Sequence, residues 1–238
     1  MPQVSARAGD RRRGGRRGGR RRYVWHGGIG HGDLHSESLP DRDDRGHVHR
    51  RTADDPFLPQ GTGAPSVAWM ARTLVLIRHA KAVHPEGRDD HARRLADQGR
   101  RDAPVIGRWL HEQGVPVDVA IVSSARRTME TYRLLATELG ARAPDPVVSD
   151  DVYYGSAGDL LEIVRALPPE TSSAAIVGHN PGIGMLASAL DDGTSLIEAT
   201  RMRAGFPTSS VAVFAVDGDW ATVDPGGARL VGYAVARG

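Results

Sequence analysis

The chain has 238 residues, no cysteine and a formal net charge of +2, which leaves room for one good-sized domain and excludes disulfides, thiolate nucleophiles and cysteine-based zinc sites. No apolar run approaches the roughly 20 residues that a membrane-spanning helix needs, and the Arg-rich start lacks the apolar segment of a secretory signal. We therefore expect a cytoplasmic protein without a membrane segment.

Charge divides the chain into two parts. Residues 1–69 hold 13 Arg against 8 Asp and Glu, whereas residues 70–238 hold 18 Lys and Arg against 21 Asp and Glu. The first part contains the run RRRGGRRGGRRR and has no periodic apolar pattern, so it buries too little apolar surface to offset the entropy of ordering the chain. We expect a disordered Arg/Gly/His-rich tail over residues 1–69 and one folded domain over residues 70–238.

Three interpretations of the tail compete. Its Arg-Gly run could bind nucleic acid through phosphate contacts, which is the only way in which we expect this protein to bind nucleic acid. Its histidines could bind a metal, although they lack ligand spacing. The interpretation that we favour is a start codon assigned too early, because Met70 directly precedes the first predicted strand of the folded domain. The tail histidines are His26, His31, His35, His47 and His49.

Apolar patterning after the tail predicts strands that alternate with helices. The run LVLI at 74–77 is continuous, as is typical of a strand covered on both faces. In chain order the predicted elements are a strand at 73–77, a helix at 97–113, a strand at 117–122, a helix at 128–139, a short strand or loop at 146–148, a helix at 159–167, a strand at 174–177, a helix at 183–190, and strands at 210–216 and near 230–235. This order indicates an α/β fold, a three-layer sandwich with a mainly parallel central sheet.

Polar residues gather where three predicted strands end, as RH at 78–79, SSARR at 123–127 and GHNPG at 178–182. Taken singly, these segments have plain structural explanations as a surface pair, a solvated helix start and a turn. In a parallel sheet, however, ligands bind at the carboxyl ends of strands, where helix N-termini favour anions. If the strands are parallel neighbours, two histidines and at least two arginines converge on one anionic group.

Phosphate is the anion that fits such a pocket. Arginine presents a planar fork that matches phosphate oxygens and stays charged at any working pH. A neutral histidine whose far nitrogen is held by a hydrogen bond can act as a nucleophile. Fixed cations then stabilise the charge on the transferred phosphoryl group. No carboxylate cluster is present that would hold a metal, so we expect neither a metal nor a cofactor.

The segments LIRHAKA, SSARRTMET and VGHNPGI, in this order, resemble the motifs of the histidine phosphatase superfamily, and more closely those of its small phosphohistidine phosphatase branch, the SixA type. The resemblance spans about residues 73–233 and implies a phosphoglycerate mutase-like fold. It implies that His79 takes the phosphoryl group covalently, and that Arg78, Arg127 and His179 bind the phosphate. Ser123 and Asn180 come with the same motifs as expected substrate-binding residues.

Two of these assignments depend on alignment details. The second arginine of the family lies four residues before a threonine, so counting back from Thr131 selects Arg127, and a shift by one residue would select Arg126. The segment DHARRLADQGRRDA at 90–103 resembles an Arg-Pro-Leu-x-x-x-Gly stretch of this branch and places Arg93 near the pocket mouth. A plain charged loop before a helix is the alternative for that segment.

The sequence departs from the family pattern at three points. Ala80 stands where many members have Gly, so the backbone after His79 should avoid a conformation that only Gly adopts easily. Arg94 stands where Pro is usual. The glutamate that the mutase-like branch uses as a proton donor has no clear counterpart; the candidates are Asp150, Asp151 and Glu162.

From the resemblance we expect a metal-independent phosphatase that works through a phosphohistidine intermediate, acting on phosphohistidine in proteins. The missing proton donor favours this substrate, because an imidazole is a far better leaving group than an alkoxide. The expected partner is therefore a phosphorylated protein or a small-molecule phosphate. The alternatives are a broad phosphomonoesterase that acts on small phosphorylated metabolites, and a phosphate-binding protein without catalysis.

Overall fold

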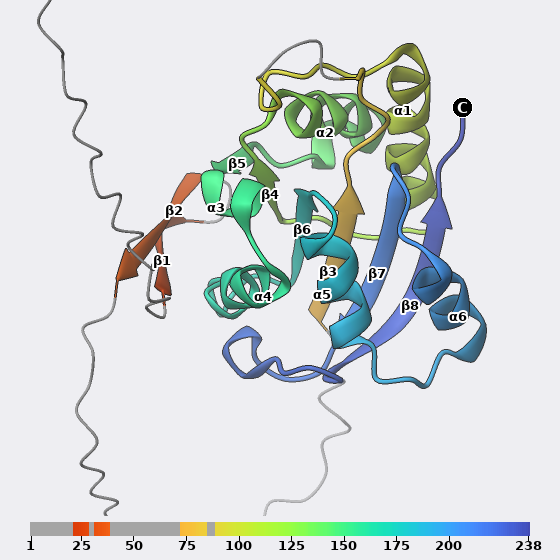
Figure 1. Ribbon diagram of the computed structural model, residues 1–238. Coiled ribbons are helices and arrows are strands. Elements are labelled where there is room, and N and C mark those ends of the chain that lie inside the picture. Colours follow the sequence, from red (N-terminus) through yellow and green to blue (C-terminus); the bar gives the residue numbers. More distant parts are fainter. Residues whose placement is uncertain (1–20, 29–30, 39–71, 85–88) are drawn as a thin grey trace, which may run out of the picture.

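The computed structural model describes residues 21–28, 31–38, 72–84 and 89–238 (Figure 1). Its main feature is a six-stranded sheet in the order β5-β4-β6-β3-β7-β8. The strands are β3 (Arg72–Arg78), β4 (Val119–Ser123), β5 (Pro146–Ser149), β6 (Ser173–Gly178), β7 (Ser210–Val216) and β8 (Ala228–Val235). Strands β3 to β6 run parallel to one another, β7 is antiparallel to β3, and β8 is antiparallel to β7. The predicted mainly parallel sheet is thus confirmed.

Helices cover both faces of this sheet and complete the three predicted layers (Figure 1). One face carries α1 (Asp97–Glu112) and α2 (Arg126–Leu139), and the other carries α4 (Ala157–Arg165), α5 (Gly182–Leu190) and α6 (Leu196–Ala204). The shorter elements are the helix α3 (Asp150–Tyr154) and the 3-10 turns η1 (Gly140–Arg142) and η2 (Trp220–Thr222). No described helix is long and apolar enough to cross a bilayer.

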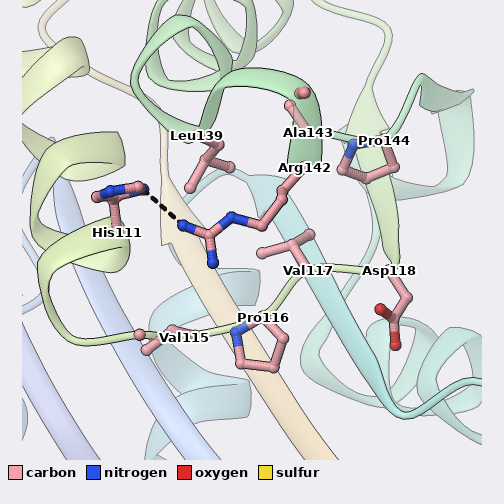
Figure 2. A pocket seen from close by; sticks show the side chains of 11 residues that line it. His111, Val115, Pro116, Val117, Asp118, Leu139, Arg142, Ala143 and Pro144 are labelled. Atoms are coloured by element: carbon pink, nitrogen blue, oxygen red, sulfur yellow. Dashed lines mark hydrogen bonds between the residues drawn. The ribbon is translucent and has the colours of Figure 1, made fainter.

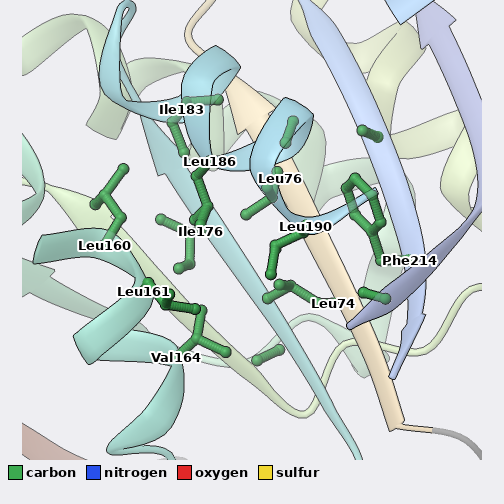
Figure 3. Packing of buried hydrophobic residues seen from close by; sticks show 14 of the residues in the cluster. Leu74, Leu76, Leu160, Leu161, Val164, Ile176, Ile183, Leu186, Leu190 and Phe214 are labelled. Atoms are coloured by element: carbon green, nitrogen blue, oxygen red, sulfur yellow. The ribbon is translucent and has the colours of Figure 1, made fainter. Parts of the chain in front are cut away.

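The central strand β3 contributes to two apolar cores. Leu74 and Leu76 pack on the side of α4 and α5, where Figure 3 shows them among Leu186, Leu190 and Phe214. Val75 and Ile77 alternate with them and pack against the apolar faces of α1 and α2. All four β3 residues are fully buried, which explains why the sequence of this strand shows no polar alternation.

The predicted elements of the folded part all occur in the structure, with ends within two residues of those predicted. The prediction missed two helices, α3 and α6. Helix α3 has only five residues, too few to show a helical period, and α6 carries charged or polar residues on most of its surface. Both lie in segments that the sequence analysis left without structure.

Two strands lie inside the segment that we predicted to be a tail. β1 (Arg21–Gly28) and β2 (His31–Ser38) form an antiparallel pair that is separate from the six-stranded sheet. The sequence did not predict this pair, because it has no alternation of apolar and polar residues. The rest of the predicted tail lies outside the described residues, and the domain boundary near residue 70 stays a prediction.

Replacing Leu76 with Ala should destabilise the fold without touching the strand ends. Leu76 is fully buried in the core between the sheet and α5, so the truncation leaves a cavity and should cost about 2–5 kcal/mol of the free energy of unfolding. Urea denaturation followed by circular dichroism measures this. Ile197→Ala on α6 is the control, because Ile197 is 76% exposed and its loss should change stability by less than about 0.5 kcal/mol. Equal effects of the two substitutions would contradict the assigned core.

Candidate active site

The sheet topology brings the three polar strand ends together. β6 pairs in parallel with β4 on one side and β3 on the other, so the carboxyl ends of all three strands meet at one edge. His79 follows β3 and His179 follows β6, and the centroids of their rings lie 5.1 Å apart. The condition set by the sequence analysis, parallel and neighbouring strands, is therefore met.

His79 is held by backbone groups on several sides. Its amide donates to the carbonyl of Gly178 at 3.1 Å, and its own carbonyl accepts from the amide of Ser209 at 3.2 Å. The ring Nδ1 lies 2.8 Å from the carbonyl oxygen of Ala80. Because a carbonyl can only accept, Nδ1 carries the proton and Nε2 keeps its lone pair. The ring is thus fixed in the tautomer that a nucleophile at Nε2 requires.

The surroundings of His79 also keep its ring neutral. The side chain is 8% exposed, and burial is the largest cause that lowers its pKa from 6.5 to about 4. The hydrogen bond with Ala80 opposes this shift, whereas the nearby positive charges of Arg127, Arg78 and Arg93 add to it. A ring with this pKa is neutral at pH 7, and its lone pair is available.

His179 is linked to two other elements. Arg127 Nη2 donates to its Nδ1 at 3.2 Å, so the ring proton lies on Nε2, which donates to Ser123 Oγ at 2.8 Å. Burial, followed by His79 and Arg127, lowers the pKa of His179 to about 3. Ser123 is fully buried at the end of β4, and its hydroxyl contacts the ring of His179.

The two predicted phosphate-binding arginines share one feature. Arg78 Nη1 donates to the carbonyl of Phe206 at 2.9 Å, and Arg127 donates from Nη1 to the carbonyl of Asp90 at 2.7 Å and from Nη2 to its Oδ2 at 2.9 Å. The Nε of each arginine is buried and has no hydrogen-bond partner in the described part of the chain. Buried polar groups without a partner are rare and costly, so these N–H groups point to an anionic ligand.

The remaining predicted residues occupy different places around this cluster. Arg93 donates from Nη1 to Asp90 Oδ1 at 2.8 Å and from Nε to the carbonyl of Val83 at 2.8 Å, so it joins the cluster through Asp90. Asn180 donates from Nδ2 to the carbonyl of Phe206 at 2.8 Å. The same carbonyl accepts the hydrogen bond from Arg78 Nη1. This bond ties the segment after His179 to the loop before β7.

Arg126 and Arg127 have opposite environments, which bears on the alignment. Arg127 is 5% exposed and reaches the histidines, whereas Arg126 is exposed and forms an ion pair with Glu130 at 2.7 Å. Arg127 is therefore the arginine that the structure brings into the cluster.

The structure also shows how Ala80 replaces Gly. In the described part of the chain, Ser209 is the one non-glycine residue with a positive φ, 65°, so Ala80 has an ordinary backbone conformation. The Ala80 amide donates to Thr131 Oγ1 at 3.0 Å, and this hydroxyl donates to the Arg127 carbonyl at 2.7 Å. Thr131 thus links the backbone after His79 to the helix that carries Arg127.

Sequence reasoning missed Asp90 and Tyr153. Asp90 accepts hydrogen bonds from Arg93, Arg127 and the hydroxyl of Tyr153, the last at 3.0 Å. The ring of Tyr153 also makes an edge contact with His179, with centroids 5.3 Å apart. Asp90 lies in a charged segment, DDHARR, which gave no sign of which carboxylate would point inward.

A separate pocket of about 430 Å³ lies away from this cluster (Figure 2). Val117 and Asp118 line it just before β4, so it opens at the opposite end of that strand from Ser123. Its most prominent polar contact is a hydrogen bond of 2.9 Å that Arg142 Nη2 donates to His111 Nδ1. None of the predicted site residues lines this pocket.

Comparison with known proteins gives the family. The model of the histidine phosphatase superfamily (branch 1) matches residues 74–152. An uncharacterized protein of Mycobacterium tuberculosis is 36% identical over 163 residues, which make up 68% of this chain and 100% of that protein. The structure of a protein assigned as phosphohistidine phosphatase SixA from Nakamurella multipartitia is 31% identical, with a TM-score of 0.61 over 69% of this chain and 95% of that one. The chain belongs to the histidine phosphatase superfamily.

Within this superfamily, the likeness to the SixA structure at 31% identity places the protein among the SixA-like phosphatases. A second structure, assigned as SixA from Agrobacterium tumefaciens, supports the same grouping at 27% identity and a TM-score of 0.58, covering 69% of this chain and 97% of that one. The phosphatase has its two histidines and two arginines at the strand ends where the three motifs fall. The roles of the individual residues are proposals.

The pKa of His79 predicts how this phosphatase responds to acid. Because the pKa is lowered to about 4, the ring should stay neutral as pH falls through 6.5 and should take up a proton only near pH 4. NMR titration of ¹⁵N-labelled protein, with the signal assigned through a His79→Gln variant, measures the midpoint. Arg127→Ala should raise that midpoint, because it removes a nearby positive charge. A midpoint near 6.5 in the unmodified protein would contradict the buried, neutral ring.

Proposed function

We propose that the protein is a metal-independent phosphatase that removes the phosphoryl group from phosphohistidine in proteins through a covalent intermediate on His79. The observation that carries this proposal is the neutral His79 ring, with its lone pair on Nε2, beside two buried arginine Nε–H groups that find no partner among the described residues. A nucleophile and fixed donors for phosphate oxygens are thereby assembled in one place.

In the first step, His79 Nε2 attacks phosphorus while the bond between phosphorus and the substrate nitrogen breaks. The electron pair of that bond leaves with the substrate imidazole, which departs as a neutral ring because its other ring nitrogen carries a proton. Arg78 and Arg127 bind the equatorial oxygens through their Nε–H groups. His179, the third predicted phosphate ligand, lies beside His79 with its ring nitrogens engaged by Arg127 and Ser123. In the second step, water attacks the phosphorus of phospho-His79 and the bond between phosphorus and Nε2 breaks. Inorganic phosphate leaves, the protons of the water stay on the phosphate or pass to solvent, and Nε2 recovers its lone pair. The two guanidinium groups stabilise the charge on the transferred group in both steps.

The proposed substrate is supported by the two described carboxylates whose contacts argue against a proton donor. The carboxylate nearest the cluster is Asp90, whose pKa is lowered to about 2, chiefly by the hydrogen bond from Arg93. Glu162, a predicted candidate, pairs with Arg165 at 2.7 Å on α4. An imidazole, with an ordinary pKa near 6.5, leaves without a strong acid, whereas a sugar alkoxide requires one.

The access to the site supports a substrate carried on a protein. Only α3 and a two-residue link join β5 to α4, so this connection has no room for an inserted cap. An apolar groove of about 400 Å³ adjoins the cluster through Asn180 and Phe206 and includes Met185, which is 59% exposed. Two of the proteins that resemble this chain carry the assignment phosphohistidine phosphatase SixA, which agrees with the proposal.

The proposed independence of metal rests on the charges of the site. Arg78 and Arg127 supply the positive charge that a metal ion supplies in other phosphoryl-transfer enzymes. The described residues include no group of three His, Cys, Asp or Glu side chains arranged to hold a metal ion. Dialysis against EDTA should therefore leave the rate of phosphate release unchanged.

His79→Ala should abolish turnover and phosphoenzyme formation, because no other group in the cluster offers a free lone pair at this position. Brief incubation with a ³²P-labelled phosphohistidine peptide, quenched in alkali because phosphohistidine is labile in acid, measures the intermediate. His111→Ala is the matched control, since His111 lines the separate pocket and should retain full labelling. Substantial turnover by the His79 variant would rule out the proposed mechanism.

A comparison of leaving groups should identify the substrate class. The rate constant kcat/KM should be at least about 100-fold higher for a phosphohistidine peptide than for a sugar phosphate, because the alkoxide leaves without help from an acid. p-Nitrophenyl phosphate, with a good leaving group, should fall between them. Equal rates on the peptide and the sugar phosphate would instead favour a broad phosphomonoesterase.

A further inference from the structure

We propose that Asp90 is a positioning residue for phosphoryl transfer, which holds Arg127 so that the Nε–H of this arginine faces the phosphoryl group. The inference deepens the proposed function and rests on it. Neither the family motifs nor the sequence pattern singled out Asp90, whereas the structure places it directly against the arginine.

Asp90 binds Arg127 at two points. Its carbonyl accepts from Nη1 at 2.7 Å and its Oδ2 accepts from Nη2 at 2.9 Å, so both terminal nitrogens are engaged by one residue. Two parallel hydrogen bonds fix the plane of a guanidinium as well as its position. The rotation of the Arg127 head group is therefore set by Asp90.

The orientation that results is the one phosphate binding requires. Nη2 and the Nε–H lie on the same edge of a guanidinium, and Nη2 of Arg127 also faces His179 Nδ1 at 3.2 Å. The edge that carries the unpartnered Nε therefore turns toward the histidines. If Asp90 did not hold the other edge, Arg127 could rotate and present a different pair of donors.

Asp90 is itself held by two further elements. Arg93 donates to Oδ1 at 2.8 Å, and the hydroxyl of Tyr153, from α3, donates to Oδ2 at 3.0 Å. These bonds keep the carboxylate ionised, with a pKa of about 2, so it acts as a fixed acceptor at every working pH. The loop that carries Asp90 and Arg93, helix α3 and the start of helix α2 thus meet at the Asp90 carboxylate.

A positioning role differs measurably from a structural one. The Asp90 side chain is 47% exposed, and ion pairs at that exposure contribute little to stability. Removing it should leave the fold intact and reduce the stabilisation of the transition state. Because the substrate also binds through Arg78 and its organic portion, kcat should change more than KM.

The test uses the full chain and the variants Asp90→Ala and Asp90→Asn, assayed with a phosphohistidine peptide. We expect kcat to fall about 10- to 100-fold in Asp90→Ala, with KM within about threefold, and the inhibition constant of orthovanadate to rise by a similar factor to the fall in kcat. Asp89→Ala is the matched control. Asp89 is the preceding residue, its Oδ1 accepts from the Ala92 amide at 3.1 Å, and its loss should change kcat less than twofold. Should Asp90→Ala not fold, the isosteric Asp90→Asn, which keeps one acceptor oxygen, should show a smaller loss in the same direction.

A double-mutant cycle with Arg127→Ala decides whether Asp90 acts through that arginine. In the Arg127→Ala background, adding Asp90→Ala should change kcat by less than about threefold, because the group that Asp90 positions is already absent. A full second loss in that background would overturn the inference, as would an Asp90→Ala variant as active as Asp89→Ala. These failures are separate from failure of the proposed function, which would appear as an unlabelled wild-type enzyme or an active His79→Ala variant.

Discussion

The parallel pairing of β3 with β6 is the constraint on which the site depends. Arg78 lies opposite Gly178 in this ladder, and the His79 amide extends it by donating to the Gly178 carbonyl. His79 and His179 therefore leave the sheet side by side. Because side chains alternate between the faces of a strand, a shift of one residue in this register would direct the two histidines to opposite faces.

Burial and positive charge act together on the imidazoles. Burial lowers the pKa of both rings, and the arginines lower them further, so the histidines stay neutral although they lie beside cations. The same burial makes the arginines effective, because charges interact more strongly where water is excluded. Carbonyl groups of Phe206 and Asp90 take up part of the donor capacity of the two guanidiniums, and the unpartnered Nε groups remain for an anion. The site thus combines an uncharged imidazole with fixed positive charge.

Two of the described carboxylates near the site, those of Asp90 and Glu130, pair with arginines. Hydrogen bonds from Arg93 and Arg127 lower the pKa of Asp90 and keep it ionised. Glu130 pairs with Arg126 and accepts a hydrogen bond from the amide of Leu95 at 2.8 Å. Under the proposed function, a phosphatase built in this way depends on the quality of the leaving group. This dependence connects the electrostatics of the cluster to the proposed phosphohistidine substrate.

Sequence by itself determined the layered α/β fold and the residues of the three motifs. Continuous apolar runs mark strands covered on both faces, and the polar residues that interrupt them mark the strand ends, so both are visible in local order. Only the tertiary structure decided that Arg127 and not Arg126 faces the histidines, and that Asp90, among several carboxylates in one loop, holds it. The difference is physical: local periodicity reports which face of an element is buried, whereas a contact between a loop and a helix far along the chain depends on how the elements pack.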